Sequence, residues 1–505
     1  MRQLNNLAVL IALLGGLCVP HFTLAETHEL VISGGRLIDP RHRIDDVRNL
    51  GIRGGRIVTV SQEPLRGARE IDARGLVVTP GFIDLHSHAI SREAQQYQAY
   101  DGVTTALELE AGIFPIAALA DHYRPAPLLH TGASSSHLAI RQRVLGHVEQ
   151  PHFTDIATPT GNAESSNPRA GFIVQANTRQ ISEMMSLHQQ AIASGAIGIG
   201  LPLDYISRGV TVEELSALFD LAASTQAPIA VHMRRGLPGD LSGLSEMIAQ
   251  ARRSGAWVHI CHLQSMVMTG TQQAMDMIRE AVAEGVKLTA EAYPYNAGST
   301  AIGAAVFGRD WQAVFDIGFN DIQWVATGER LTAETFSHYR QHEPDGVVVH
   351  HYGDQTQTRT VMAAPDIIVA SDAMPLVDEG GFVHPRGIGT FARFVSHYVD
   401  EWDAEGPLTA SQAIAKITDL PGKLLAYTHE TLSAKGHLGE GADADITIFD
   451  PALISDHATY LAPLKHSTGV QWLLVCGVPV IAEGNLVTAP DSGGRARQLP
   501  KRCGQ

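Results

Sequence analysis

Cysteine and positively charged residues are scarce in this sequence. Only four of the 505 residues are cysteine, and 37 Lys and Arg stand against 53 Asp and Glu, which gives a formal net charge of −16. Proteins that bind DNA or RNA collect Lys and Arg to replace phosphate counterions, so we expect no nucleic-acid partner. The apolar fraction of 44% excludes a disordered polyelectrolyte and is typical of a folded globule.

Long hydrophobic runs are also lacking. The apolar run near the amino terminus, Leu7 to Val19, is too short to cross a bilayer as an anchor. Arg2 precedes this run, and Thr23-Leu24-Ala25 offers small residues for cleavage, so residues 1–25 are predicted to be a secretory signal peptide. We therefore expect a periplasmic or secreted protein with no stable membrane anchor.

Removal of the signal peptide leaves three cysteines, namely Cys261, Cys476 and Cys503. Their number is odd and they lie far apart in the chain, so we expect no disulfide framework. The stability of the protein is expected to come from its hydrophobic core.

After residue 80, apolar segments typical of strands alternate with amphipathic segments typical of helices. One helix is expected from Thr211, which can form a capping box with Glu214, and another from Thr271, with Gly285 as its stop. Eight such units are the pattern of a TIM-like (β/α)8 barrel, an α/β fold of about 250 residues. The expected strands are Phe82–Leu85, Thr104–Leu109, Pro127–His130, Ile197–Leu201, Pro228–Val231, Trp257–Cys261, Leu288–Ala292 and Ile367–Ala370.

Short β-rich segments flank the barrel region, with Gly-rich turns at 34–35 and 54–55 that suit hairpins. Since strands with exposed edges need partners, we expect one small β-sandwich domain built from both chain ends. The expected domains are the signal peptide (1–25), the first part of the β domain (26–79), the (β/α)8 barrel (80–435) with insertions at about 134–196 and 296–366, the second part of the β domain (436–490) and a loose tail (491–505).

Histidines stand at the ends of several expected strands. His86 and His88 follow the first strand in the string PGFIDLHSH, and alternate strand residues project to the same side, so both imidazoles can bind one ion. His232 ends the fifth strand, His262 the sixth and Asp372 the eighth. Because barrel chemistry lies at the carboxyl ends of the strands, this set predicts a metal centre.

Several strings in the chain resemble a known family. PGFIDLHSH, the single histidines after strands five and six, the SD after strand eight and the closing GADADITIFD resemble the amidohydrolase superfamily over nearly all of the mature chain. The strings TALELEAG, HMR, AYPYNAGST, SDAMP, HPRGIGTF and AIAKITDLPGKLL resemble its N-acyl-D-amino-acid deacylase branch, the D-aminoacylases, and more closely the D-glutamate deacylases. The resemblance implies one or two Zn²⁺ ions held by His86, His88, His232, His262 and Asp372.

The chain departs from the family at the bridging metal ligand. Many superfamily members bridge two metals with a carboxylated Lys from strand four. Here that strand reads AIGIGLPLDY and contains no Lys. D-aminoacylases place a Cys near the end of strand two, where this chain has Ala111. Two carboxylates remain nearby, and Zn²⁺ accepts carboxylate oxygen readily. We expect Glu110 as the bridging ligand; the alternative is Glu108, which could instead be a salt-bridge partner.

The resemblance also implies that the α-carboxylate of an N-acyl amino acid is bound by Arg386, Tyr293 and Ser299. A guanidinium matches a carboxylate with two charge-assisted bonds. D-aminoacylases place a Lys two residues after the sixth-strand histidine, where this chain has Gln264. Arg234 and Arg235 could supply the missing charge or bind the side-chain carboxylate of an acidic substrate, or form a solvated pair. His137, after the third strand, is a further candidate for substrate contact.

The expected function is zinc-dependent hydrolysis of N-acyl-D-amino acids, with acidic ones such as N-acyl-D-glutamate preferred. Zn²⁺ lowers the pKa of bound water from about 15.7 to about 7, and Asp372 would pass the water proton to the leaving nitrogen. The alternatives are a dipeptidase or cyclic-amide hydrolase of the same superfamily, against which the missing Lys counts, and a non-catalytic periplasmic binding protein. The preference for D and for acidic residues rests on the resemblance alone.

Overall fold

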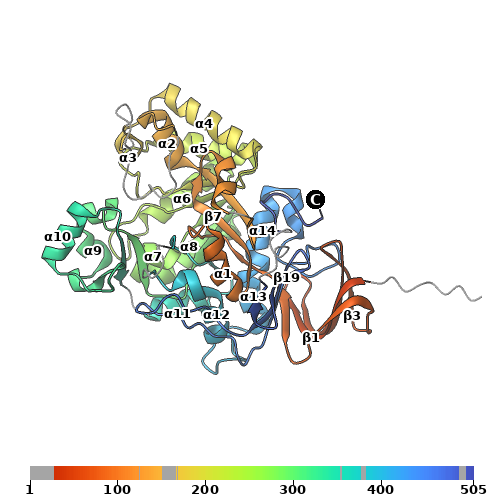
Figure 1. Ribbon diagram of the computed structural model, residues 1–505. Coiled ribbons are helices and arrows are strands. Elements are labelled where there is room, and N and C mark those ends of the chain that lie inside the picture. Colours follow the sequence, from red (N-terminus) through yellow and green to blue (C-terminus); the bar gives the residue numbers. More distant parts are fainter. Residues whose placement is uncertain are drawn as a thin grey trace, which may run out of the picture.

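The computed structural model describes residues 28–123, 126–149, 167, 169–352, 355–376, 383–487 and 496–504. The expected signal peptide, residues 1–25, lies outside the described residues, so it stays a prediction. None of the described helices is long and apolar enough to cross a membrane. Two large sheets and one small one organise the described chain (Figure 1).

Eight parallel strands form a nearly closed barrel, which confirms the expected α/β fold. The first and last strands approach each other at a parallel bridge between Ser87 and Ala373. In sequence order the strands are β6 (Phe82–Asp84), β7 (Val103–Ile113), β8 (His130–Ser136), β9 (Ile199–Leu201), β10 (Ile229–Val231), β11 (Val258–Ile260), β12 (Leu288–Ala292) and β16 (Ile368–Val369).

One strand begins later than expected. The sequence predicted a strand over Pro127–His130, whereas β8 begins at His130. The side chain of Gln95 accepts hydrogen bonds from the backbone N–H groups of Leu128 and Leu129 at 2.7 and 3.3 Å. Because a side chain already pairs these N–H groups, the segment does not need a neighbouring strand there.

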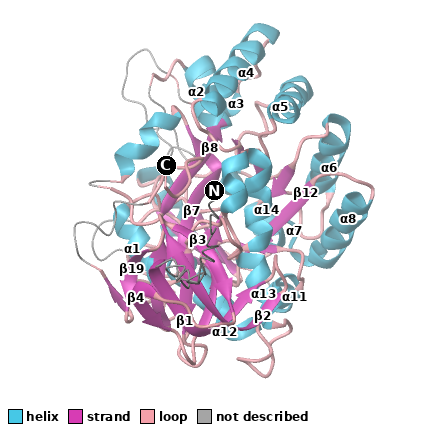
Figure 2. Ribbon diagram, turned by 90° about the vertical axis from the view of Figure 1, so that its right-hand side faces the viewer, coloured by secondary structure: helices cyan, strands magenta, loops and turns pink. Residues whose placement is uncertain are grey.

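Helices cover the outside of the barrel, as α5, α6 and α8 show in Figure 2. The α5 helix (Val212–Thr225) begins where the Thr211 hydroxyl accepts from the Glu214 N–H at 3.2 Å, and it buries Leu215 and Phe219. The remaining helices are α1 (Arg92–Tyr100), α2 (His137–Gly146), α3 (Ala170–Ile173), α4 (Thr178–Ala193), α6 (Ser242–Ser254), α7 (Leu263–Val267), α8 (Thr271–Ala283), α9 (Trp311–Phe315), α10 (Ala333–His342), α11 (Gln355–Ala363), α12 (Arg386–Tyr398), α13 (Ala410–Ile417) and α14 (Asp419–Thr428).

Two long segments extend the barrel at its carboxyl-terminal end. The first, between β8 and β9, carries α2, α3 and α4. The second, between β12 and β16, forms an antiparallel sheet of β13 (Ala297–Ala301), β15 (Val347–His351) and β14 (Ile322–Trp324). It encloses an aromatic core of its own that includes Phe307, Trp311 and Phe336. Its helices α9 and α10 lie on the side of the barrel away from β1 and β3 (Figure 1).

Both chain ends contribute to one nine-stranded sheet. The sheet joins the two ends where β5 pairs antiparallel with β17. The strands are β1 (His28–Asp39), β2 (Ile44–Arg53), β3 (Arg56–Ser61), β4 (Gly67–Asp72), β5 (Val77–Pro80), β17 (Ile446–Phe449), β18 (Val470–Val475), β19 (Val478–Ala482) and β20 (Asn485–Leu486).

One of the two expected glycine turns is absent. Gly54 and Gly55 turn the chain between β2 and β3, but β1 continues through Gly34 and Gly35 with a shift of register. A Cβ atom on Gly35 would lie 2.5 Å from the Val78 side chain. The glycine therefore allows close approach of β5 rather than a hairpin.

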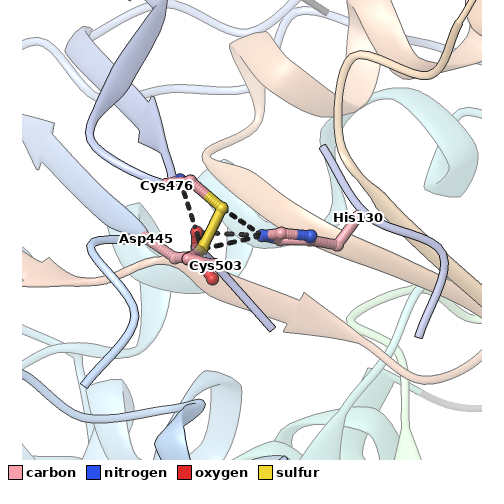
Figure 3. Close-up of side chains that lie close together, drawn as sticks. All are labelled: His130, Asp445, Cys476 and Cys503. Atoms are coloured by element: carbon pink, nitrogen blue, oxygen red, sulfur yellow. Dashed lines mark hydrogen bonds and ion pairs between the residues drawn. A yellow bond between two sulfur atoms is a disulfide. The ribbon is translucent and has the colours of Figure 1, made fainter. Parts of the chain in front are cut away.

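The expectation of no disulfide is wrong, since Cys476 and Cys503 are bonded to each other (Figure 3). The expected loose tail is also wrong for residues 496–504, because Leu499 is buried and its N–H donates to the Thr131 carbonyl at 2.7 Å. An odd cysteine count does not exclude one pair, and folding returns the end of the chain to β8. The third cysteine, Cys261, is buried and free.

The disulfide packs against His130, the first residue of β8 (Figure 3). His130 Nδ1 accepts from the Arg497 N–H at 3.0 Å, and Nε2 lies 3.0 Å from an Asp445 carboxylate oxygen. Asp445 also pairs with the buried Lys435. We call these residues, His130, Lys435, Asp445, Cys476 and Cys503, the disulfide cluster.

Candidate active site

The structure brings the four predicted histidines and Asp372 together at the carboxyl ends of the barrel strands. His86 and His88 approach to 3.1 Å between their Nε2 atoms, and the rings of His232 and His262 lie 4.6 Å apart between centroids. Asp372 Oδ1 lies 3.5 Å from His86 Nε2 and 3.6 Å from His88 Nε2. All five side chains are buried.

Two carboxylates fix the orientation of the first histidine pair. His86 Nδ1 lies 2.5 Å from a Glu291 oxygen, and His88 Nδ1 lies 2.6 Å from a Glu108 oxygen. Each carboxylate accepts the Nδ1–H, so the Nε2 lone pairs of both rings face each other. Metal-ligating histidines have this arrangement, in which a carboxylate holds the ring nitrogen that does not bind the ion.

Glu108 is therefore the partner of a histidine, whereas Glu110 lies among the imidazoles. One Glu110 oxygen is 2.7 Å from His262 Nε2 and 3.0 Å from His232 Nδ1. The other is 3.3 Å from His86 Nε2 and 3.5 Å from His88 Nε2. Glu110 therefore contacts all four predicted histidine ligands, whereas Glu108 contacts one of them.

Glu291 is a functional residue that the sequence reasoning missed. It is a residue of β12, and its second oxygen lies 2.9 Å from His259 Nε2, so it links two histidines. The available signal was a carboxylate in the seventh strand, directly before AYPYNAGST. Nothing in that string indicates that Glu291 would reach a histidine of the first strand, because the pairing depends on closure of the barrel.

The carboxylates and imidazoles of the predicted metal centre favour the binding of a cation. Burial alone would raise the pKa of Glu110, but the imidazoles of His86, His262 and His232 hold the pKa well below its usual range. Burial would lower the pKa of His86, yet Glu110, Asp372 and Glu291 raise it well above the ordinary value. Imidazole nitrogen and carboxylate oxygen are ligands that suit Zn²⁺. Three groups that share His86 have the spacing to hold an ion. Two of them consist of predicted ligands, namely His86, Glu110 and His262, and His86, His88 and Asp372, and the third joins His86 to Cys261 and Glu291.

A cavity of about 420 Å³ opens over this centre, and we call it the catalytic cavity. His88, Glu110, His232, His262 and Asp372 line its inner side. The insertion between β12 and β16 supplies much of the opposite wall, from Gly298 to Ala301 on β13 and with His350 on β15. The insertion therefore shapes the space in which a substrate would lie.

The cavity brings together the three residues predicted to bind a carboxylate: Arg386, Tyr293 and Ser299. The Arg386 guanidinium lies 4.6 Å from the centre of the Tyr293 ring, and its Nη2 is 3.0 Å from Asp372 Oδ1. Ser299 Oγ donates to the Val348 carbonyl at 3.0 Å. Arg235 also lines the cavity, with its guanidinium 4.9 Å from the centre of the Phe315 ring.

The prediction that Arg234 and His137 contact the substrate is wrong, because neither residue lines the catalytic cavity. Arg234 forms an ion pair with Glu246 instead. The His137 ring is fully buried, with Nδ1 3.0 Å from His188 Nε2 and Nε2 2.9 Å from Glu214. His137 is the first residue of α2, and its ring packs in the protein interior rather than toward the centre.

The sequence also missed Tyr205, which lies in the loop after β9 and lines the catalytic cavity. Its ring packs edge-on against His232, with 4.8 Å between centroids, and its hydroxyl lies 3.2 Å from the Thr300 hydroxyl. A single tyrosine in a loop carries no sequence signal that it will line a cavity beside a predicted metal ligand.

A parallel barrel with clustered imidazoles and carboxylates at the carboxyl ends of its strands defines a metal-dependent barrel hydrolase. The amidohydrolase family model matches residues 77–480. The chain belongs to the amidohydrolase family, and it is an enzyme that hydrolyses amide bonds. The resemblance noted in the sequence is thereby confirmed.

The chain is similar to two curated proteins of Alcaligenes xylosoxydans xylosoxydans. It is 28% identical to the N-acyl-D-glutamate deacylase, over 91% of this chain and 94% of that one. It is 29% identical to the D-aminoacylase, over 91% and 96% of the two chains. The crystal structure of N-acyl-D-glutamate deacylase from Bordetella bronchiseptica, complexed with zinc and a phosphonate inhibitor, superposes with a TM-score of 0.75 at 22% identity. That likeness covers 94% of this chain and 99% of the other, and it shows the fold.

Proposed function

We propose that the protein is a zinc-dependent N-acyl-D-amino-acid deacylase of the periplasm that prefers acidic substrates such as N-acyl-D-glutamate. The observation that carries this proposal is the pair of imidazole Nε2 atoms of His86 and His88, 3.1 Å apart, with Glu110 and Asp372 beside them in a buried cavity. The names of the similar curated proteins support the substrate class.

The residues that would hold zinc are His86, His88, Glu110, His232, His262 and Asp372. When bound, the metal would lower the pKa of water to about 7 and polarise the acyl carbonyl. Glu108 and Glu291 would keep the first two imidazoles in the ligand orientation through their Nδ1 atoms. A non-catalytic binding protein would have no need of this complete set.

Asp372 is the residue that we propose moves the proton. Its carboxylate accepts a proton from the attacking water and gives it to the nitrogen of the breaking C–N bond, which must leave as an amine because an amide anion is too basic. Arg386 Nη2, 3.0 Å from Asp372 Oδ1, fixes the direction of the carboxylate. The products are a carboxylate and a free amino acid.

Two guanidinium groups in one cavity support the preference for acidic substrates. Arg386 and Tyr293 would bind the α-carboxylate of the substrate. Arg235 would bind the side-chain carboxylate, since it supplies a positive charge that Gln264 lacks. Its guanidinium is held in the cavity by the Ser265 hydroxyl, 3.1 Å away, and by the Phe315 ring. Two cationic groups suit a substrate with two carboxylates better than one with a single carboxylate.

The test is release of amino acid from N-acetyl D- and L-amino acids by the zinc-loaded protein. We expect N-acetyl-D-glutamate to have the highest kcat/KM, and Arg235→Gln to lower its advantage over N-acetyl-D-glutamine by about tenfold, the size expected for one charge-assisted bond. A profile restricted to dipeptides would contradict the proposal. So would stoichiometric zinc without turnover of any N-acyl amino acid, which would favour a binding protein.

A further inference from the structure

A second cavity of about 600 Å³ lies beside the catalytic cavity, and we call it the arginine cleft. The two share Asp204 and Tyr205 as wall residues. The cleft is bounded on one side by Phe172 and Ile173 of α3 and on the other by residues of the β13–β15 insertion. Because the Tyr205 ring lies against His232, the cleft begins one aromatic ring away from a predicted metal ligand.

Positive charge collects in this cleft although the protein carries a net charge of −16. Among its described lining residues are four arginines: Arg169, Arg208, Arg309 and Arg340. Asp204 is the one acid among these lining residues. Its carboxylate already pairs with Arg309 and accepts the Arg235 N–H at 2.9 Å. The cleft therefore has more cationic groups than its own carboxylate can neutralise.

Arg340 shows the excess most clearly. It is half-buried, and its guanidinium donates to the Ile302 carbonyl at 3.0 Å rather than to a carboxylate. Desolvation by burial lowers its pKa below the usual value. Within the described part of the chain, no ion pair involves Arg340 or Arg208. An anion in the cleft would offset the cost of burying this unpaired charge.

The rest of the lining is largely apolar. Phe172, Ile173, Ala305 and Pro344 face the cleft, and Ile173 remains 56% exposed. Apolar walls with arginines among them suit a short aliphatic chain that ends in an anionic group. A fully polar ligand would leave this apolar surface in contact with water.

We propose that the arginine cleft binds the far end of the substrate's acyl group, and that the enzyme prefers substrates whose acyl group ends in a carboxylate. This inference rests on the proposed function. Since Arg386 and Arg235 are assigned to the two carboxylates of the amino acid, the acyl group is the part of the substrate left to extend past Tyr205. Water adds across the C–N bond, so an N-glutaryl substrate yields glutarate and the free amino acid.

Two substrates with acyl chains of equal length test the proposal. N-glutaryl-D-glutamate and N-pentanoyl-D-glutamate have five acyl carbons each and differ in the terminal carboxylate. We expect kcat/KM to be about tenfold higher for the glutaryl compound, the effect of one charge-assisted pair. The double variant Arg208→Gln/Arg340→Gln should bring the ratio close to one, while turnover of N-acetyl-D-glutamate is retained.

The matched control is Arg252→Gln/Arg253→Gln on α6, which removes the same charge from exposed positions outside the cleft. It should keep the glutaryl preference, and Arg340→Lys should keep part of it. Thermal denaturation shows whether each variant is folded. Equal kcat/KM for the two acyl groups in the wild type would overturn the proposal, as would a preference that survives in the Arg208/Arg340 double variant.

Failure of the proposed function is seen separately, as no turnover of N-acetyl-D-glutamate by the wild type. The cleft is then tested by calorimetry with glutarate and pentanoate as probes. Tighter binding of glutarate by the wild type, lost in the Arg208/Arg340 variant, supports an anion site. Equal binding of the two probes overturns it.

Discussion

Buried histidines and carboxylates gather at both ends of the barrel strands, but with different hydrogen bonding. In the centre at the carboxyl ends, His86 and His88 donate from Nδ1 to carboxylates and their Nε2 atoms face each other. In the disulfide cluster, at the start of β8, both nitrogens of His130 have partners, since Nδ1 accepts from Arg497 and Nε2 pairs with Asp445. Only the first arrangement leaves nitrogen lone pairs for an ion.

The difference follows from a general property of barrels, in which the carboxyl ends of the strands carry chemistry and the amino ends carry stability. At the first end, side chains of several strands converge on a cavity, and at the second the end of the chain packs on the barrel. The number of histidines and carboxylates does not distinguish the predicted metal centre from the disulfide cluster. The hydrogen-bond partners of the imidazole nitrogens distinguish them, and three substitutions test this difference.

The largest effect is expected for Asp372→Asn. The amide keeps the size of the side chain but cannot accept the water proton, so kcat should fall by about 10²- to 10⁴-fold, the usual contribution of a general acid–base group. Zinc content, measured by atomic absorption, should stay close to that of the wild type. The matched change in the other cluster, Asp445→Asn, should leave kcat of the folded protein within twofold. Wild-type activity in Asp372→Asn would exclude its assigned role.

A smaller effect is expected for Glu291→Gln, which removes the negative charge behind His86. Loss of such a supporting carboxylate weakens metal affinity by about 10- to 100-fold. Competition with a chromophoric zinc chelator measures this change. Glu246→Gln, which breaks the ion pair with Arg234 outside the cavity, serves as the control and should leave zinc affinity unchanged. Unaltered affinity in Glu291→Gln would mean that Glu291 does not support the metal centre.

The smallest effect on activity is expected for Cys503→Ser, which opens the disulfide of the other cluster. Removal of a disulfide that closes a loop of this length costs about 2–4 kcal/mol of unfolding free energy. Denaturant unfolding of the oxidised proteins should show this loss, while kcat/KM at 25 °C changes less than twofold. A Cys503→Ser variant with normal stability but lost activity would remove the proposed division of roles between the two ends.

The neighbouring pairs Glu108/Glu110 and Arg234/Arg235 show where sequence reasoning ends. The sequence places both members of each pair next to the same strand end. In the structure Glu110 reaches all four predicted histidine ligands, whereas Glu108 bonds to His88 alone among them. Arg235 enters the cavity and Arg234 pairs with Glu246. Which member faces the centre depends on local backbone direction, which composition and periodicity do not report.

Local sequence patterns predict the eight strands and the β segments at the two chain ends. They also place the predicted ligands directly after their strands, namely His86, His88, His232, His262 and Asp372. Apolar periodicity marks each strand, and parallel closure sends all the carboxyl ends to one rim. The sequence by itself therefore determined the barrel and the rim at which chemistry would occur.

Only the tertiary structure decided which distant groups meet. Glu291 reaches His86 across 205 positions, Cys503 returns to Cys476, and four arginines from separate segments line one cleft. Such contacts depend on the final packing of side chains that lie far apart in the sequence. No short-range sequence pattern encodes these contacts, because the local sequence around a residue does not indicate which distant residue it will contact.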